Sequence, residues 1–263
     1  MSQNYSKLSQ KPIEGSVESR DRTNWWMILV IPAWVVISFF GAQIVVIGLS
    51  WGFKLSGVSL ISLNPSILNT LLASLIYLIT LAFVILLPLR IKKIKTSRKE
   101  IGLTRLPRWG DILLAPAGLV AYLIVSSLLI LLATKVLPGF NIDQVQDTGF
   151  SQVSQRYEYV LAFATLVVVA PIAEEILFRG YLFGKLKKYV PVWVAVIITS
   201  VLFGTVHGSW NVAIDTFALS IMLCLLREFT GSIWSSILLH MIKNGIAFYI
   251  LFIYPTLLTT LVK

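Results

Sequence analysis

The chain has few charged residues for its length. Of its 263 residues, 13% are charged and 57% are hydrophobic, whereas water-soluble domains carry about 25% charged residues. Most of the surface must therefore face something other than water, which excludes an ordinary soluble domain. It also makes every ionisable side chain inside an apolar stretch a candidate for function, because such groups are costly at bilayer depth.

Cysteine and histidine are also scarce. Cys224 is the one cysteine, so the chain forms no intrachain disulfide and has no cysteine-based metal site. The two histidines, His207 and His240, both lie in apolar, helix-like sequence. Residues 171–180 carry two glutamates and an arginine in similar surroundings. Three polar clusters in three apolar segments predict a reaction centre inside a membrane.

Long apolar runs dominate the rest of the sequence, and a run of about 20 residues can cross a bilayer as a helix. We therefore predict an all-α fold, a polytopic transmembrane helix bundle of seven or eight spans. The seven runs are 25–49, 67–89, 112–134, 159–183, 190–206, 210–226 and 233–251. The tail 256–262 is predicted to be an eighth, partial element or an interfacial segment.

Residues 1–24 are rich in polar side chains and are predicted to be a disordered cytoplasmic N-terminus. The first apolar run is too long for a cleavable signal peptide, so we expect it to remain as a membrane anchor.

Basic residues are distributed unevenly around these runs. They cluster before the first run and after the second, fourth and sixth, which places one large set on one side of the bundle: Lys7, Lys11, Arg20, Arg22, Arg90, Lys92, Lys93, Lys95, Arg98, Lys99, Arg105, Arg108, Lys185, Lys187, Lys188 and Arg227. By the positive-inside rule, this side and the N-terminus are cytoplasmic. The net charge of +10 then reflects topology and contact with the lipid bilayer, and no nucleic-acid partner is predicted.

The two adjacent glutamates are predicted to have different roles. Glu175 and Arg179 are four residues apart, so they share one face of a helix and can pair. Glu174 is rotated from Glu175 by about 100°, points elsewhere and has no local partner. This division leaves Glu174 free for chemistry. For Glu175 and Arg179, a structural ion pair that holds two helices together is as good an interpretation as a role in the reaction. Pro171 predicts a helix kink close to both glutamates.

Each histidine is followed at helical spacing by an asparagine. His240 and Asn244 are predicted to lie on one face of the last long helix. His207 and Asn211 have the same spacing, although the glycine and serine between them could end the helix. An asparagine can donate a hydrogen bond to a developing oxyanion and can accept one from an imidazole. Lys243 lies nearby but is left outside the predicted site, because its long stem can reach outward.

Three motifs therefore stand in order along the chain: Glu174-Glu175-x-x-x-Arg179, Phe203-x-x-x-His207 and His240-x-x-x-Asn244. In order and spacing they resemble the motifs of the CPBP family, the CAAX protease and bacteriocin-processing family, also called Abi. This family includes the Ras-converting CAAX endopeptidase. The resemblance covers residues 159–244 and suggests a catalytic core at 157–263, preceded by a three-span region with a basic loop at 25–156.

The resemblance implies an intramembrane metalloendopeptidase whose site contains Glu174, Glu175, Arg179, His207, His240 and Asn244. In such an enzyme Glu174 would activate water and Asn244 would stabilise the oxyanion. Zinc or another divalent metal would be bound by Glu174, His207 and His240, or the two histidines would position the water without a metal. The expected substrate is a membrane-associated protein or peptide, in a bacterial plasma membrane, and we expect the cavity to open on the cytoplasmic side.

Other classes of intramembrane protease do not match. The sequence has no His-Glu-x-x-His helix of a zincin and no Gly-x-Ser-Gly of the rhomboid type, and its aspartates lack the Gly-x-Gly-Asp setting of presenilin-like enzymes. The alternative from a different class is a proteolytically silent membrane protein, namely a scaffold, an immunity factor or a small transporter with an intramembrane polar site.

Overall fold

The computed structural model describes residues 24–142, 144, 148–150 and 153–255. Throughout these residues the regular elements are helices, as the sequence predicts. The predicted disordered segment 1–24, apart from its last residue, and the predicted eighth element at 256–262 lie outside the described residues.

Each of the seven predicted apolar runs forms a helix or a continuous series of helices. The first three are α1 (Met27–Leu55), α2 (Pro65–Lys92) and α4 (Trp109–Val136), with the short η2 (Leu60–Ser62) and α3 (Arg98–Ile101) between them. The last three are α8 (Val192–Thr205), α9 (Trp210–Thr230) and α10 (Trp234–Phe248), which continues as η5 (Tyr249–Ile253).

The fourth run is one long helix in which the hydrogen-bond pattern changes repeatedly. It consists of α5 (Arg156–Phe163), η3 (Ala164–Val169), α6 (Ala170–Glu174), η4 (Glu175–Phe183) and α7 (Gly184–Leu186). Both η3 and η4 are π-helical. We refer to this series as the central helix.

Five of the described helical stretches are long and apolar enough to cross a membrane: Met27–Leu55, Pro65–Lys92, Trp109–Val136, Arg156–Leu186 and Trp234–Ile253. The sequence predicted seven or eight spans. The difference lies in α8 and α9. With 14 residues, α8 is about 21 Å long, which is shorter than the hydrocarbon core of about 30 Å. The 21 residues of α9 include three charged side chains, Asp215, Arg227 and Glu228.

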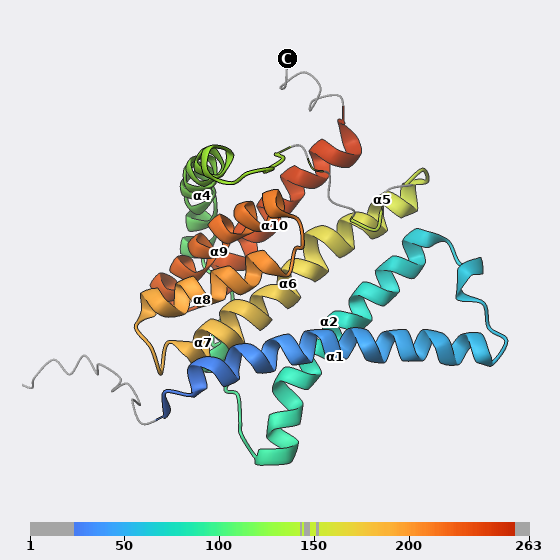
Figure 1. The fold of residues 1–263 in the computed structure, drawn as a ribbon, viewed down its shortest axis with the longest axis horizontal. Helices are drawn as coiled ribbons and strands as arrows, with labels where there is room; N and C mark the ends of the chain where they lie inside the picture. The colour runs from blue at the N-terminus through green and yellow to red at the C-terminus, as the bar shows by residue number, and fades with distance from the viewer. Residues whose placement is uncertain (1–23, 143, 145–147, 151–152, 256–263) are drawn as a thin grey trace, which may run out of the picture.

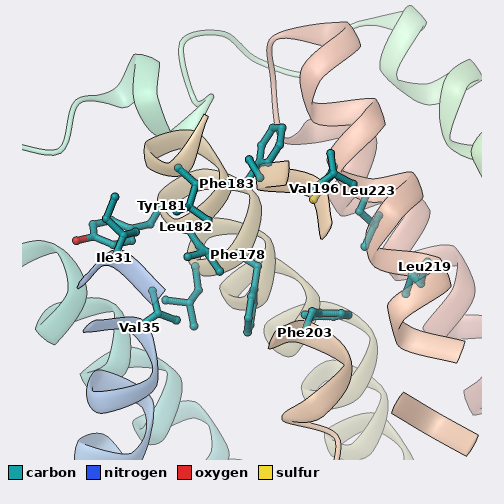
Figure 2. Packing of buried hydrophobic residues seen from close by; sticks show 14 of the residues in the cluster. Ile31, Val35, Phe178, Tyr181, Leu182, Phe183, Val196, Phe203, Leu219 and Leu223 are labelled. Carbon is teal, nitrogen blue, oxygen red and sulfur yellow. The ribbon is translucent and has the colours of Figure 1, made fainter. Parts of the chain in front are cut away.

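The helices pack on both sides of the central helix (Figure 1). On one side α1 and α2 cross each other, and on the other α8, α9, α10 and α4 form a compact group. The main apolar core lies between them and joins side chains from the central helix with others from α1, α8 and α9 (Figure 2): Ile31, Val35, Phe178, Leu182, Phe183, Phe203, Leu219 and Leu223. This core fixes the central helix, which carries both glutamates.

Large apolar side chains remain exposed along the outer helices. On α1 they include Leu29, Ile37 and Ile44, each more than 60% exposed, and similar side chains line α2 and α4. Soluble monomers rarely expose so much contiguous apolar surface. The protein is therefore an integral membrane protein whose outer helices face lipid.

Candidate active site

The central helix places the two glutamates at the junction between α6 and η4. Glu174 is the last residue of α6 and Glu175 is the first of η4. Just upstream, the hydrogen-bond pattern changes from π to α at Ala170, next to Pro171, which has no N–H to donate. Short π-helical segments occur frequently at functional sites. These changes in hydrogen bonding lie beside the glutamates, and the kink that Pro171 predicts stays a prediction.

Glu175 and Arg179 form the predicted ion pair. The Arg179 Nη1 atom donates to Glu175 Oε1 over 2.9 Å, and both side chains are fully buried. The same oxygen lies 2.9 Å from His240 Nδ1. Because a carboxylate accepts only, this contact requires Nδ1 of His240 to carry the proton. Glu175 thus joins the arginine of its own helix to the histidine of α10, which links the first and third motifs.

Glu174 lies on a different face and has a partner that the sequence did not reveal. Tyr77 of α2 donates its hydroxyl proton to Glu174 Oε1 over 2.5 Å. The other carboxylate oxygen, Oε2, is 3.7 Å from His240 Nε2. The prediction that Glu174 has no local partner is correct for its own helix, but the carboxylate is not free of contacts. The imidazole of His240 lies between the two glutamates and faces each with a different nitrogen.

His207 lies just beyond the end of α8, in the turn before α9. Its Nδ1 is 2.7 Å from the carbonyl oxygen of Phe203, so Nδ1 carries the proton and Nε2 carries the lone pair. Gly208, with φ +78°, adopts a left-handed conformation that favours glycine, and it separates the two helices. The Phe203 ring packs edge-on against both histidines, with centroids 5.0 Å from His207 and 5.7 Å from His240.

The two asparagines differ in position. Asn244 lies in α10 one turn beyond His240, as predicted, and its amide donates to the carbonyl oxygen of Leu166 in η3 over 2.9 Å. Its second amide proton is available to another acceptor. Asn211 instead donates to the carbonyl oxygens of Ile142 and Gln144, over 3.1 and 2.8 Å. The possible His207–Asn211 pair is therefore replaced by an anchor for the preceding loop.

A cavity of about 300 Å³ brings the polar residues together. Four of the six predicted site residues line it: Glu174, His207, His240 and Asn244. Glu175 and Arg179 are absent from the lining, because they are buried behind His240. The remaining walls come from α2, the central helix, α9, α10 and η5, with one loop residue: Tyr77, Thr148, Leu166, Ala170, Val212, Thr216, Leu219, Lys243, Ala247, Phe248, Leu251 and Phe252.

Lys243, which the sequence analysis left outside the site, also lines this cavity. Its Nζ atom lies 3.2 Å from Asp215 Oδ2 on α9. The other oxygen of Asp215 accepts hydrogen bonds from Tyr122, over 2.5 Å, and Ser126, over 2.7 Å, both on α4. A polar network thus ties α4, α9 and α10 together beside the candidate site. In the sequence its signals were an aspartate in an apolar segment and Lys243 beside the histidine motif.

The residues expected to bind a metal fit zinc by donor type. Two imidazoles that present Nε2 and one carboxylate are a common ligand set, and an acceptor on each Nδ1–H is the usual orienting contact. In spacing they do not form such a site: within the described part of the chain, no three His, Cys, Asp or Glu side chains are grouped as metal ligands. We therefore derive no catalytic step through a metal.

The cavity extends away from the basic loops. Its lining continues along α10 from His240 to Phe252 in η5, and includes Val212 near the start of α9 and Thr148 in the loop after α4. These residues lie toward the end of the bundle opposite Lys185–Lys188. The sequence predicts an opening at the basic end, because the distance of the glutamates from the lysines is the guide to depth that it offers. The lining instead continues toward the other end.

Comparison with known proteins supports the resemblance found in the motifs. Residues 156–246 match the type II CAAX prenyl endopeptidase Rce1-like family. The chain is 35% identical over 77 residues to "Putative membrane peptidase YdiL" of Bacillus subtilis, which is 29% of this chain and 32% of that protein. It is 35% identical over 65 residues to "UPF0177 protein YxdF" of Lactococcus lactis, which is 25% of this chain and 35% of that protein.

The chain thus spans about a third of the length of these curated relatives. No solved structure matches it significantly. All six predicted site residues fall inside the matched segment, whereas Tyr77 lies outside it. In residues 156–246 this membrane protein is therefore similar to the Rce1-like family of CAAX endopeptidases, as its three motifs predicted.

Proposed function

We propose that the protein is a membrane-embedded endopeptidase that hydrolyses a peptide bond of a membrane-associated protein or peptide, with Glu174 as the general base. The observation that carries this proposal is the division between the two glutamates. Glu175 is fully buried and engaged by Arg179 and His240, whereas Glu174 is 15% exposed and faces the cavity. A general base must contact the water molecule that it activates, and Glu174 is placed to do so.

In this proposal Glu175 and Arg179 are positioning residues. Arg179 balances the buried charge of Glu175, and Glu175 holds the Nδ1–H of His240. The lone pair on His240 Nε2 is thereby directed toward Glu174 and the cavity. This is the same logic by which a carboxylate fixes the tautomer and orientation of a catalytic histidine in other hydrolases.

The proposed reaction starts with a water molecule that donates one hydrogen bond to Glu174 and the other to the Nε2 atom of His240 or His207. Glu174 takes one proton from the water as the oxygen forms a bond to the carbonyl carbon of the substrate. The carbonyl oxygen becomes an oxyanion, to which Asn244 can donate a hydrogen bond through its second amide N–H. Glu174 then delivers its proton to the amide nitrogen as the carbon–nitrogen bond breaks, which releases an amine and a carboxylic acid.

We further propose that the protein lies in a bacterial plasma membrane with its N-terminus in the cytoplasm. The charge asymmetry of the loops supports this orientation. The apolar walls of the cavity, among them Leu166, Val212 and Phe248, support a substrate with apolar residues next to the cleaved bond. A prenylated substrate is one member of this class.

The test is cleavage of reporter peptides by the purified protein in detergent. We expect cleavage by the wild type and a loss of at least about 100-fold in kcat/KM for Glu174→Gln, because general-base catalysis contributes about 10²- to 10⁴-fold. Glu228→Gln is the matched control, since this glutamate pairs with Lys187 outside the cavity. A folded wild type that cleaves no peptide would favour a silent scaffold, immunity factor or transporter. Near-normal turnover by Glu174→Gln would remove Glu174 as the base.

A further inference from the structure

The cavity has an open direction and a closed one. Along α10 and η5 its lining begins at His240 and continues through Ala247 to Phe252, a distance of about 18 Å along the helix axis. Val212 lies near the start of α9, and Thr148 belongs to the loop that follows α4. All these positions lie toward the end of the bundle where α8 joins α9 and where η5 ends (Figure 1). We call this end the loop face.

In the other direction the cavity is blocked by tightly packed side chains. Beyond the glutamates, Arg179, Leu182 and Phe203 are each 0% exposed. The Arg179 guanidinium stacks on the Phe203 ring, 4.2 Å from its centroid. Leu239, the residue before His240, is also 0% exposed. These side chains fill the space between the candidate site and the opposite end of the bundle.

The short helix α3 closes that opposite end. It packs against two glycines of the central helix so closely that a Cβ atom on Gly180 would lie 2.7 Å from Ile101 Cγ2, and one on Gly184 would lie 2.5 Å from the Glu100 carbonyl oxygen. Arg227 of α9 donates to the same carbonyl oxygen over 3.0 Å. Because only glycine permits this approach, the seal depends on Gly180 and Gly184.

The closed end is also the basic end. Lys185 and Lys188 lie within 4 Å of the Glu100 carboxylate, and the loop 90–99 that leads into α3 carries six lysines and arginines. The loop face has few basic residues by comparison. By the positive-inside rule, the closed end is cytoplasmic and the loop face is extracytoplasmic.

We infer that the cavity admits its substrate from the extracytoplasmic side, as an apolar peptide segment that passes between the start of α9 and the end of α10. The substrate is then an extracytoplasmic membrane-anchored peptide or protein. That the protein cleaves this segment rests on the proposed function, whereas the direction of access rests only on the cavity and the charge of the two ends. Val212, Phe248, Leu251 and Phe252 form apolar walls along the route, which favour apolar side chains on the entering segment.

Single-cysteine labelling tests the direction of access without any need for activity. The background is Cys224→Ser, because Cys224 is the one native cysteine and is 0% exposed. Thr148→Cys and Ala247→Cys place a thiol in the cavity wall, and Lys188→Cys is the control at the basic end. Each is treated with a membrane-impermeant maleimide in right-side-out and in inverted vesicles. We expect Thr148→Cys and Ala247→Cys to be labelled in right-side-out vesicles, and Lys188→Cys in inverted vesicles.

Labelling of Ala247→Cys from the same side as Lys188→Cys would overturn the inference, even if Thr148→Cys behaved as expected. Labelling of Lys188→Cys from outside would overturn the assignment of the loop face to the extracytoplasmic side. A second arm presents a reporter peptide to one side of sealed proteoliposomes. Cleavage only at the loop face supports the inference, and cleavage only at the basic face refutes it. If the labelling is as expected but no peptide is cleaved at either face, the proposed function fails while the direction of access stands.

Discussion

Replacement of Glu175 by glutamine should destabilise the protein much more than the same change at Glu174. Glu175 and Arg179 are both 0% exposed, and their ion pair is 2.9 Å long. Removing one partner of a buried pair leaves an uncompensated charge and costs about 3–5 kcal/mol. Glutamine keeps an acceptor oxygen, so we expect a loss of about 3 kcal/mol. At roughly 2–4 °C per kcal/mol for chains of this size, the melting temperature should fall by about 6–12 °C.

Glu174→Gln is the matched control, because it makes the same chemical change one residue away. Glu174 has no arginine partner in the described structure, its side chain is 15% exposed, and the amide oxygen of glutamine can still accept the hydrogen bond of the Tyr77 hydroxyl. We expect a loss of no more than about 1 kcal/mol. Thermal melts of the detergent-purified variants, followed by intrinsic fluorescence at one scan rate, measure the difference. Equal shifts for the two variants would refute the division between a structural and a catalytic glutamate.

A double variant tests whether the unpaired charge is the cause of the instability. Arg179→Met in the Glu175→Gln background removes the guanidinium, so neither position of the former pair carries a charge. We expect the double variant to melt above Glu175→Gln alone, since neutral replacements of a whole buried pair are often close to neutral in stability. A double variant that melts lower than Glu175→Gln would show that packing, and not the lone charge, sets the stability.

Three further predictions concern the neighbouring groups. Tyr77→Phe should lower kcat roughly tenfold, because it removes a hydrogen bond that contributes about 1.5 kcal/mol when its acceptor is charged. Unchanged kinetics would show that the Tyr77–Glu174 contact does not serve the reaction. By donor type the sequence predicts about one bound zinc or similar ion per chain, lost in His207→Ala and in His240→Ala, although the described residues include no group of three metal ligands. Elemental analysis decides between the two, and full activity after exhaustive chelation with no metal detected contradicts the predicted ion. At the basic end, burial opposes ionisation of Glu100, but hydrogen bonds from a lysine and a backbone N–H lower its pKa from 4.5 to about 2. The contribution of Glu100 to stability should therefore be present above about pH 4.5 and be lost as the pH falls toward 2. A melting temperature that falls equally in Glu100→Gln over this range would contradict this prediction.

Much of this architecture could be predicted because it is encoded locally. A bilayer-spanning helix requires a long apolar run, so all seven helical regions could be read from hydrophobicity alone. The Glu175–Arg179 pair could be predicted because residues four apart meet on any helix. The motifs around His207 and His240 are likewise short, and their spacing identifies the polar residues that the cavity brings together.

The contacts between helices could not be predicted, and the reason is physical. In a soluble helix, the alternation of polar and apolar residues shows which face is buried. The spans here are apolar on the face toward lipid and on the face toward protein, so the sequence does not show which face of each helix packs against the protein. Tyr77 contacts Glu174 from a position 97 residues earlier, and nothing in its own segment marks the face on which it lies. The contact of Asp215 with Lys243 was hidden for the same reason.

The imidazole of His240 explains why the two glutamates of the site are neighbours in the sequence. Neighbouring residues on a helix point about 100° apart, so a ring that lies in the angle between them can face one carboxylate with Nδ1 and the other with Nε2, as His240 does. Glutamates one turn apart would share a face, and both would then be buried or both would face the cavity. Adjacent glutamates let one side chain be sealed among apolar groups with its arginine while the other meets water. We expect that moving the outer carboxylate, by combining Glu174→Ala with Ala170→Glu, would not restore activity, although Ala170 also lines the cavity. Restored cleavage by that variant would show that a carboxylate anywhere in the cavity suffices, and the bridging position of His240 would then have no catalytic role.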